Sequence, residues 1–144
     1  MSELTEAQLR NVEVVGTGVD AFRRGDAEGV LGFMHPDVEI FLPVELPNSG
    51  TYRGHDGYLA WQADWLEAWD DFSIEIAGIQ PVGERHVVAL MRQIGKGRGS
   101  GIPVDMEIAY MVEVKGRQAA AFHLYPTEKQ AVSVAEQRES QPAN

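Results

Sequence analysis

Carboxylates and a guanidinium lie in segments that otherwise alternate between apolar and polar residues. Asp105 and Glu107 alternate with the apolar residues of 104–108, and Arg92 interrupts an apolar alternation over residues 86–94. A carboxylate enclosed in an apolar pocket has a raised pKa and can move a proton beside a carbonyl group. Asp105 and Glu107 are therefore candidate general bases, and Arg92 is a candidate for orienting a bound molecule.

The spacing predicts that Arg92 and Glu107 face each other across a hairpin. The glycine-rich segment GKGRGSG, residues 95–101, separates their strands, and a turn about Gly99 and Ser100 places Arg92 opposite Glu107. An exposed ion pair between neighbouring strands is an equally good interpretation. The glycine-rich segment lacks the GxxxxGK[ST] spacing of a phosphate-binding loop, so we expect a hairpin there.

The other reactive residue types show no catalytic spacing. The chain has no cysteine, and no serine stands in a GxSxG context. The histidines form no HxxxH pair and fall in different predicted elements; they are His35, His55, His86 and His123. We therefore expect neither a metal site nor a cofactor.

Composition predicts one domain and narrows its partners. The 144 residues, 44% of them hydrophobic, suit a single domain over 1–136 followed by a polar tail over 137–144. The net charge of −10 repels nucleic acid and anionic lipid, so neither is an expected partner. The N-terminus does not resemble a signal peptide, and no apolar run reaches the roughly 20 residues that span a bilayer. A cytoplasmic location is the expectation.

The pattern of elements predicts helices first and strands afterwards. A capping box at Thr5 opens a helix that Gly25 ends, and Asp26 caps a shorter one. A strand over 37–42, a surface connection over 43–54 and a helix over 55–70 follow. Alternating strands are predicted from residue 72, over 86–94, 104–115 and 118–125, with a last helix after Thr127. This is an α+β class, in which a curved antiparallel sheet wraps around the N-terminal helices.

All the tryptophans of the chain lie on the predicted helix over 55–70. Trp61, Trp65 and Trp69 fall within an arc of roughly 80°, and a stripe of core residues is the simplest interpretation. Gln62 projects into the same arc, where a buried amide without a partner costs about 1–3 kcal/mol. An inward-pointing Gln62 would therefore mark a cavity, and one folded out to solvent would indicate ordinary core. Trp69 is expected only to pack.

The order of these motifs resembles the SnoaL-like branch of the nuclear transport factor two superfamily, which includes ketosteroid isomerases. The similar segments are AFRRGDAEGVLGFMHPDVEI (21–40), TYRGHDGYLAW (51–61), RQIGKGRGSG (92–101) and the final strand through Tyr125. The resemblance implies a cone-shaped domain whose sheet and helices enclose an apolar pocket, commonly in a homodimer through the sheet.

The proton-transfer groups that the resemblance implies are missing at each matched position. The catalytic aspartate of ketosteroid isomerases precedes a proline at the end of the first strand, where this chain has Leu42. Their oxyanion-binding tyrosine stands seven residues before the Gly-Asp pair, where this chain has Gly18. In cyclase-like and epoxide hydrolase-like relatives an acidic residue precedes the last strand's tyrosine, where this chain has Leu124.

These observations favour a protein that binds a small apolar molecule in an internal pocket. The expected pocket residues are apolar or aromatic apart from one amide: Trp61, Trp65, Gln62, Val38, Ile40, Leu42, Phe122 and Leu124. The alternative is an enzyme of the isomerase, polyketide cyclase or epoxide hydrolase type that uses relocated carboxylates, Glu107 or Asp105. A third possibility is an interaction domain with a filled interior.

Overall fold

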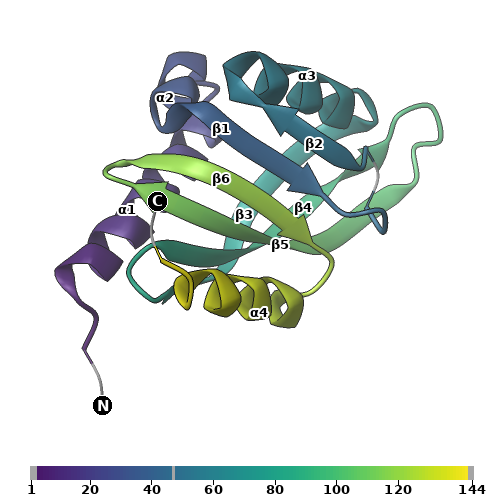
Figure 1. The fold of residues 1–144 in the computed structure, drawn as a ribbon. Coiled ribbons are helices and arrows are strands. Elements are labelled where there is room, and N and C mark those ends of the chain that lie inside the picture. The colour runs from purple at the N-terminus through teal and green to yellow at the C-terminus, as the bar shows by residue number, and fades with distance from the viewer. Residues whose placement is uncertain (1–2, 47, 143–144) are drawn as a thin grey trace.

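The structure, a computed structural model that describes residues 3–46 and 48–142, places a six-stranded sheet between two sets of helices (Figure 1). Helices α1 (Glu6–Arg23), α2 (Ala27–Gly32) and α3 (Gly54–Glu67) lie on one face, and α4 (Glu128–Glu139) lies on the other. The strands are β1 (Met34–Leu42), β2 (Gly50–Arg53), β3 (Trp69–Val82), β4 (His86–Gly97), β5 (Pro103–Lys115) and β6 (Gln118–Tyr125). The α+β prediction is confirmed.

The sheet has the order β2-β1-β6-β5-β4-β3, and one pair of neighbours departs from the predicted antiparallel pattern. Strands β1 and β6 run parallel, because the chain returns after β5 to insert β6 beside β1. The other neighbouring pairs are antiparallel. The β4–β5 register puts Arg92 opposite Glu107, as the predicted turn required.

Side-chain caps define the N-terminal helices. The Thr5 hydroxyl accepts a hydrogen bond from the Gln8 backbone N–H at 3.1 Å, and the Gln8 side chain completes the capping box. Gly25 follows α1 with a φ of 71°, a conformation that glycine adopts more readily than other residues. The Asp26 carboxylate then accepts from the Gly29 N–H at 3.0 Å and caps α2. The predicted stops and starts are confirmed here.

Helix α3 ends earlier than predicted, so Trp69 belongs to β3 rather than to the helix. The backbone of Trp69 pairs with Gly97 on β4, and this ladder replaces the last helical turn. The indole lies over Gly95, where an added Cβ would come within 2.8 Å of the Trp69 ring. The short strand β2 also forms inside the segment predicted as a surface connection, where it pairs with β1.

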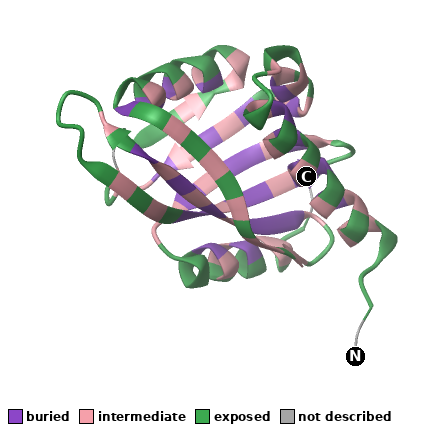
Figure 2. Ribbon diagram, turned by 180° about the vertical axis from the view of Figure 1, so that it is seen from behind, coloured by how far each residue is buried: buried purple, intermediate pink, exposed green. Residues whose placement is uncertain are grey.

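The sheet has two distinct faces, and β4 shows how its side chains divide between them. Val87, Ala89 and Met91 face α1, α2 and α3 and belong to the main core. Val88 and Leu90 face the other way and pack with α4. We call these the inner and the outer face. Figure 2 shows the buried and less buried residues alternating along the strands.

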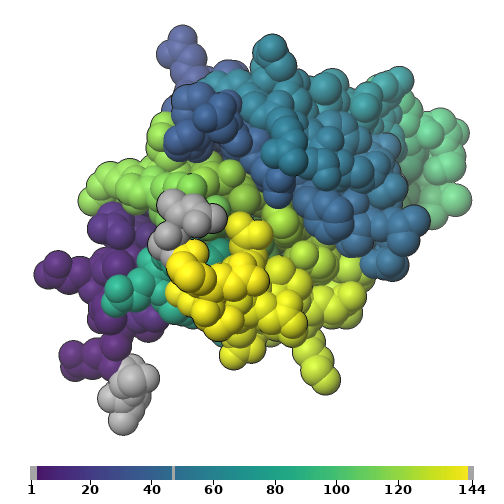
Figure 3. Space-filling model, in the orientation of Figure 1, coloured from purple at the N-terminus to yellow at the C-terminus, as the bar shows by residue number. Residues whose placement is uncertain are grey.

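Helix α4 lies on the outside of the molecule (Figure 3). It continues to Glu139, beyond residue 136, where a polar tail was predicted. Ala131 and Ala135 are fully buried against the sheet. The helix persists because its last residues are bound: Glu139 accepts hydrogen bonds from the buried His86 and from the Arg85 backbone, and Arg138 donates to His86 Nε2 at 3.2 Å. The end of α4 is therefore part of the folded domain.

These contacts define the protonation state of His86. An arginine N–H can only donate, so His86 Nε2 must accept, and the ring proton on Nδ1 points to the Glu139 carboxylate. Burial lowers the pKa of His86, although Glu139 and Glu113 act in the opposite direction. Burial alone would raise the pKa of Glu139, but the hydrogen bonds from His86 and Arg85 leave it below its ordinary value. The ring is therefore neutral in the folded protein at neutral pH.

Candidate functional site

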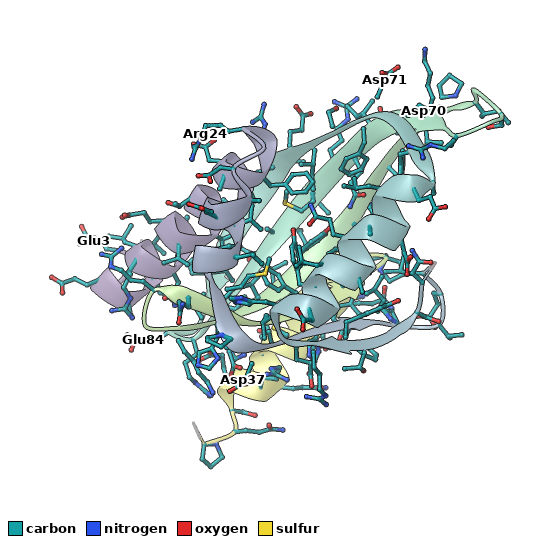
Figure 4. All side chains as sticks on the ribbon, turned by 90° about the horizontal axis from the view of Figure 1, so that it is seen from above. Glu3, Arg24, Asp37, Asp70, Asp71 and Glu84 are labelled. Atoms are coloured by element: carbon teal, nitrogen blue, oxygen red, sulfur yellow. The ribbon has the colours of Figure 1, made fainter. Side chains whose placement is uncertain are left out.

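A cavity of about 90 Å³ lies between the inner face of the sheet and helices α1, α2 and α3. Its wall is apolar and aromatic apart from a few hydroxyl, indole and amide groups. It is lined by Val15, Gly18, Val19, Phe22, Val30, Phe33, Met34, Tyr58, Trp61, Gln62, Trp65, Leu66, Phe72, Ile74, Ala89, Met91, Tyr110, Val112 and Phe122. The labelled charged side chains in Figure 4 lie at the periphery, away from this space.

A second hollow of about 240 Å³ adjoins the cavity where the α1–α2 turn meets α3. The residues that line both spaces are Phe22, Val30, Tyr58, Gln62 and Leu66. Asp26 and Leu59 line only the hollow, and Leu59 is 44% exposed. The cavity is therefore nearest to solvent between α2 and α3, with Gln62 at the border.

Gln62 lies at this border and not on the solvated side of α3. It is half-buried and lines both spaces, whereas Asp64 and Glu67 on the same helix are exposed. A polar side chain directed into the space between helix and sheet was the sequence criterion for a cavity, and Gln62 meets it.

The predicted pocket residues divide into a lining and a supporting layer. Trp61, Trp65, Gln62 and Phe122 line the cavity. The others are fully buried on the inner face but do not line it: Val38, Ile40, Leu42 and Leu124. The three residues on β1 lie behind the wall because α3 packs closely on this strand. Trp69 also stays outside the lining and packs edge-on against Phe72, at 5.2 Å between ring centroids.

Sequence reasoning missed the polar group at the base of the site, Gln93. This side chain is 0% exposed, and its Oε1 accepts a hydrogen bond from Trp65 Nε1 at 3.0 Å. Its Nε2 donates to the Tyr110 hydroxyl oxygen at 3.2 Å. The available signal was alternation, because Gln93 shares its side of β4 with Val87, Ala89 and Met91. Sequence reasoning selected the adjacent Arg92 instead, which points to the opposite face of the sheet.

The lining also contains polar groups without a protein partner. Within the described residues, the indole Nε1 of Trp61 is buried and has no hydrogen-bond acceptor. The hydroxyls of Tyr58 and Tyr110 lie in the same wall, and burial raises the pKa of both, so both phenols stay protonated at neutral pH. The cavity therefore presents hydrogen-bond donors in apolar surroundings.

The three candidate catalytic residues lie on the outer face of the sheet, outside the cavity. Arg92 bonds Asp105 Oδ2 at 2.6 Å and Glu75 Oε1 at 3.2 Å, with side chains 43%, 53% and 49% exposed, respectively. Glu107 is exposed as well. Arg92 was expected to orient a ligand, but its position in the alternation of β4 directs it away from α1, α2 and α3 and from the cavity. A hydrogen bond from Arg92 also lowers the pKa of Asp105, which is opposite to what a general base needs.

The positions matched to catalytic residues of the resembled family are closed by packing. A Cβ on Gly18 would lie 2.4 Å from the Phe33 ring, so this phenylalanine occupies the space that a side chain at position 18 would need. Leu42 and Leu124 are buried in the core. Within the described residues the cavity wall contains no carboxylate, so the enzymatic alternative has no general base there.

Comparison with known protein families identifies the family of the chain. A model of the SnoaL-like domain matches residues 15–122. The chain belongs to the SnoaL-like domain family. A presumed SnoaL-like polyketide cyclase from Jannaschia sp. CCS1 has a similar structure, with a TM-score of 0.75, 18% identity, and coverage of 99% of this chain and 100% of that one.

Other solved structures share the fold of this SnoaL-like domain. TerC, co-crystallised with polyporic acid, has a TM-score of 0.71 and 21% identity, and the match covers 88% of this chain and 98% of that one. An NTF2-like protein of unknown function from Burkholderia pseudomallei K96243 has a TM-score of 0.72 and 19% identity, with coverage of 88% and 97%. Comparison with curated proteins finds no match. At these identities the likeness shows the fold.

Across residues 3–46 and 48–142, no cluster of three or more histidine, aspartate or glutamate side chains could hold a metal ion. None of the helices in these residues combines the length and the apolar character that crossing a membrane requires.

Proposed function

We propose that this SnoaL-like domain binds a small, largely apolar molecule in the cavity between α3 and the inner face of the sheet. The observation that carries the proposal is the wall itself, which is aromatic and aliphatic and has Gln62 at its border with the outside. TerC, which shares the fold, was co-crystallised with polyporic acid. Apolar cavities on the order of 150 Å³ hold benzene, whereas this cavity has a volume of about 90 Å³. A molecule of one ring or more would therefore also occupy part of the adjoining hollow.

Tryptophan fluorescence tests this proposal, because Trp61 and Trp65 line the cavity. We expect some members of a panel of monocyclic, terpenoid and polyketide-like compounds to change the emission in a saturable manner. Ala89→Ile should abolish the response, because it places three more carbon atoms into the cavity. Ala77→Ile makes the same change at an exposed position on β3 and should leave the response intact. A panel without any response, or equal responses in both variants, would contradict the proposal.

We also propose that the protein is a cytoplasmic homodimer, formed through the part of the outer face that α4 leaves open. The absence of cysteine supports a reducing compartment. Side chains on this part of the outer face support the proposed interface. The ring centroids of Phe41 on β1 and His123 on β6 lie 5.3 Å apart, and His123 Nε2 is 2.9 Å from the Glu39 carboxylate. Light scattering after size exclusion should give twice the chain mass, and Phe41→Glu should give the monomer. A wild-type monomer at all concentrations would refute this.

A further inference from the structure

The hydrogen bonds behind the cavity wall run in one direction. An indole N–H can only donate, so the oxygen of Gln93 must face Trp65 and its NH₂ group must face Tyr110. The Tyr110 hydroxyl consequently accepts from Gln93, and its own hydrogen is available for a different acceptor. Within the described residues no protein group accepts it. The chain of hydrogen bonds therefore ends with a donor in the cavity wall.

One other group in the wall repeats this polarity, because the indole N–H of Trp61 is buried without an acceptor among the described residues. The hydroxyl of Tyr58, which can donate as well as accept, belongs to a residue that lines the same cavity. Gln62, at the border, carries the one carbonyl oxygen among the lining side chains of the described chain. An unpaired buried donor costs about 1–3 kcal/mol, so donors that gather in one wall favour a ligand that accepts hydrogen bonds.

The charge of the lining side chains further restricts the class of ligand. The lining side chains named above include neither a cation nor an anion, so a charged ligand would lose its hydration without gaining a counter-ion. The buried phenols keep their protons, because burial raises their pKa. The wall is therefore suited to a neutral oxygen and poorly suited to a carboxylate or an amine.

We infer that the bound molecule is neutral and apolar except for a carbonyl or ether oxygen, and that the Tyr110 hydroxyl donates a hydrogen bond to this oxygen. The inference rests on the proposed binding function and specifies its ligand class. Gln93 and Trp65 act as positioning residues, since they hold the Tyr110 oxygen so that its hydrogen points away from them. The site assigned here differs from the positions of Gly18, Leu42 and Leu124, and it requires no proton transfer.

A pair of probes that match in shape tests the inference. Cyclohexanone and methylenecyclohexane differ mainly in an oxygen that replaces a CH₂ group. Their dissociation constants can be measured by NMR titration of the tryptophan indole N–H signals in the wild type and in Tyr110→Phe. We expect the substitution to weaken cyclohexanone binding about three- to tenfold more than methylenecyclohexane binding. Any general loosening of the site affects both probes and cancels in this comparison.

Tyr125→Phe is the matched control, because it removes the same hydroxyl group away from the cavity. Tyr125 packs on the outer face with α4. It should change the binding of neither probe. The carbonyl stretching frequency of bound cyclohexanone is a second measurement that needs no variant, and a hydrogen bond should lower it relative to the ketone in cyclohexane. Equal losses for both probes and an unshifted carbonyl frequency would overturn the inference while the binding proposal stands. Failure of both probes to bind, while other compounds of the panel still change the tryptophan emission, would overturn the inference alone. Failure of the whole panel would overturn both.

Discussion

Replacing Gln93 with methionine tests the buried polar chain most directly. Methionine has nearly the shape of glutamine, so Gln93→Met removes the amide without emptying the space. The side chain is 0% exposed, and it holds the only acceptor for Trp65 Nε1 among the described residues. The substitution therefore leaves one buried N–H without a partner and removes the donor to Tyr110.

The expected loss of stability follows from these bonds. An orphaned Trp65 N–H costs about 1–3 kcal/mol, and the lost bond to Tyr110 about 0.5–1.5 kcal/mol more. The apolar methionine offsets part of this, because it is buried more favourably than an amide. We expect a net decrease of about 2 kcal/mol in the free energy of unfolding. For a chain of this size such a loss lowers the Tm by roughly 4–8 °C.

Urea denaturation of four proteins measures this effect: wild type, Gln93→Met, Trp65→Phe and the double variant. Trp65→Phe removes the N–H, so Gln93→Met should cost less in that background, by about 1 kcal/mol. Gln80→Met is the control, because Gln80 is exposed on β3, and it should change stability by less than about 0.5 kcal/mol. A Gln93→Met protein as stable as the wild type, or with the same cost in both backgrounds, would refute the hydrogen-bond chain.

Three further substitutions test features outside the cavity. Arg92→Met should leave ligand binding unchanged and stability nearly unchanged, because the ion pairs of Arg92 are exposed. Ligand titrations would measure the binding, and melting curves would measure the stability. Thr127→Ala removes the cap of α4, where the hydroxyl accepts from the Gln130 N–H at 3.2 Å, and should cost about 1 kcal/mol in denaturant unfolding. His86→Gln should reduce the loss of stability between pH 7 and pH 5, measured in the same way.

The sign for His86 follows from proton linkage. Its pKa is lower in the folded state than its ordinary value of 6.5, so the unfolded chain binds the proton first as the pH falls. Stability is therefore full above about pH 6.5 and declines as the pH falls toward the folded pKa, with a slope of at most about 1.4 kcal/mol per pH unit. The pKa of His123 is also lowered by burial, so His86→Gln should reduce the slope without abolishing it. An unchanged slope would contradict the prediction for His86→Gln. An unchanged free energy of unfolding would contradict the prediction for Thr127→Ala, and lost ligand binding would contradict the prediction for Arg92→Met.

Local signals made the helix starts and one strand register predictable. Thr5, Asp26 and Thr127 are polar side chains followed by helical periodicity, and each caps a helix in the structure. The turn at Gly99 and Ser100 sets the β4–β5 pairing, because glycine at 99 adopts a φ of 84°. Such features depend on a few neighbouring residues, so the sequence contains the information they need.

The faces of β4 were harder to assign, since both sides of that strand are covered. The strand is almost continuously apolar, with the main core on the inner face and α4 on the outer one. When both faces are buried, alternation no longer shows which of two adjacent polar residues points inward. Arg92 drew attention as the only cation in the run, but a guanidinium can reach solvent at the sheet surface. Gln93, one residue further, is the polar side chain that faces the helices.

The pairing of Trp65 with Gln93 was beyond prediction for a related reason. It joins residues 28 positions apart, and it forms only if the tryptophan side of α3 lies over the inner face of β4 at one height. Helical periodicity fixes the direction of Trp61, Trp65 and Gln62 around α3, but it does not fix where along the sheet the helix sits. The same indole stripe could pack on an apolar strand or over a buried amide. What distinguishes the two cases is whether an indole N–H finds an acceptor: Trp65 does and Trp61 does not, although both indoles line the cavity.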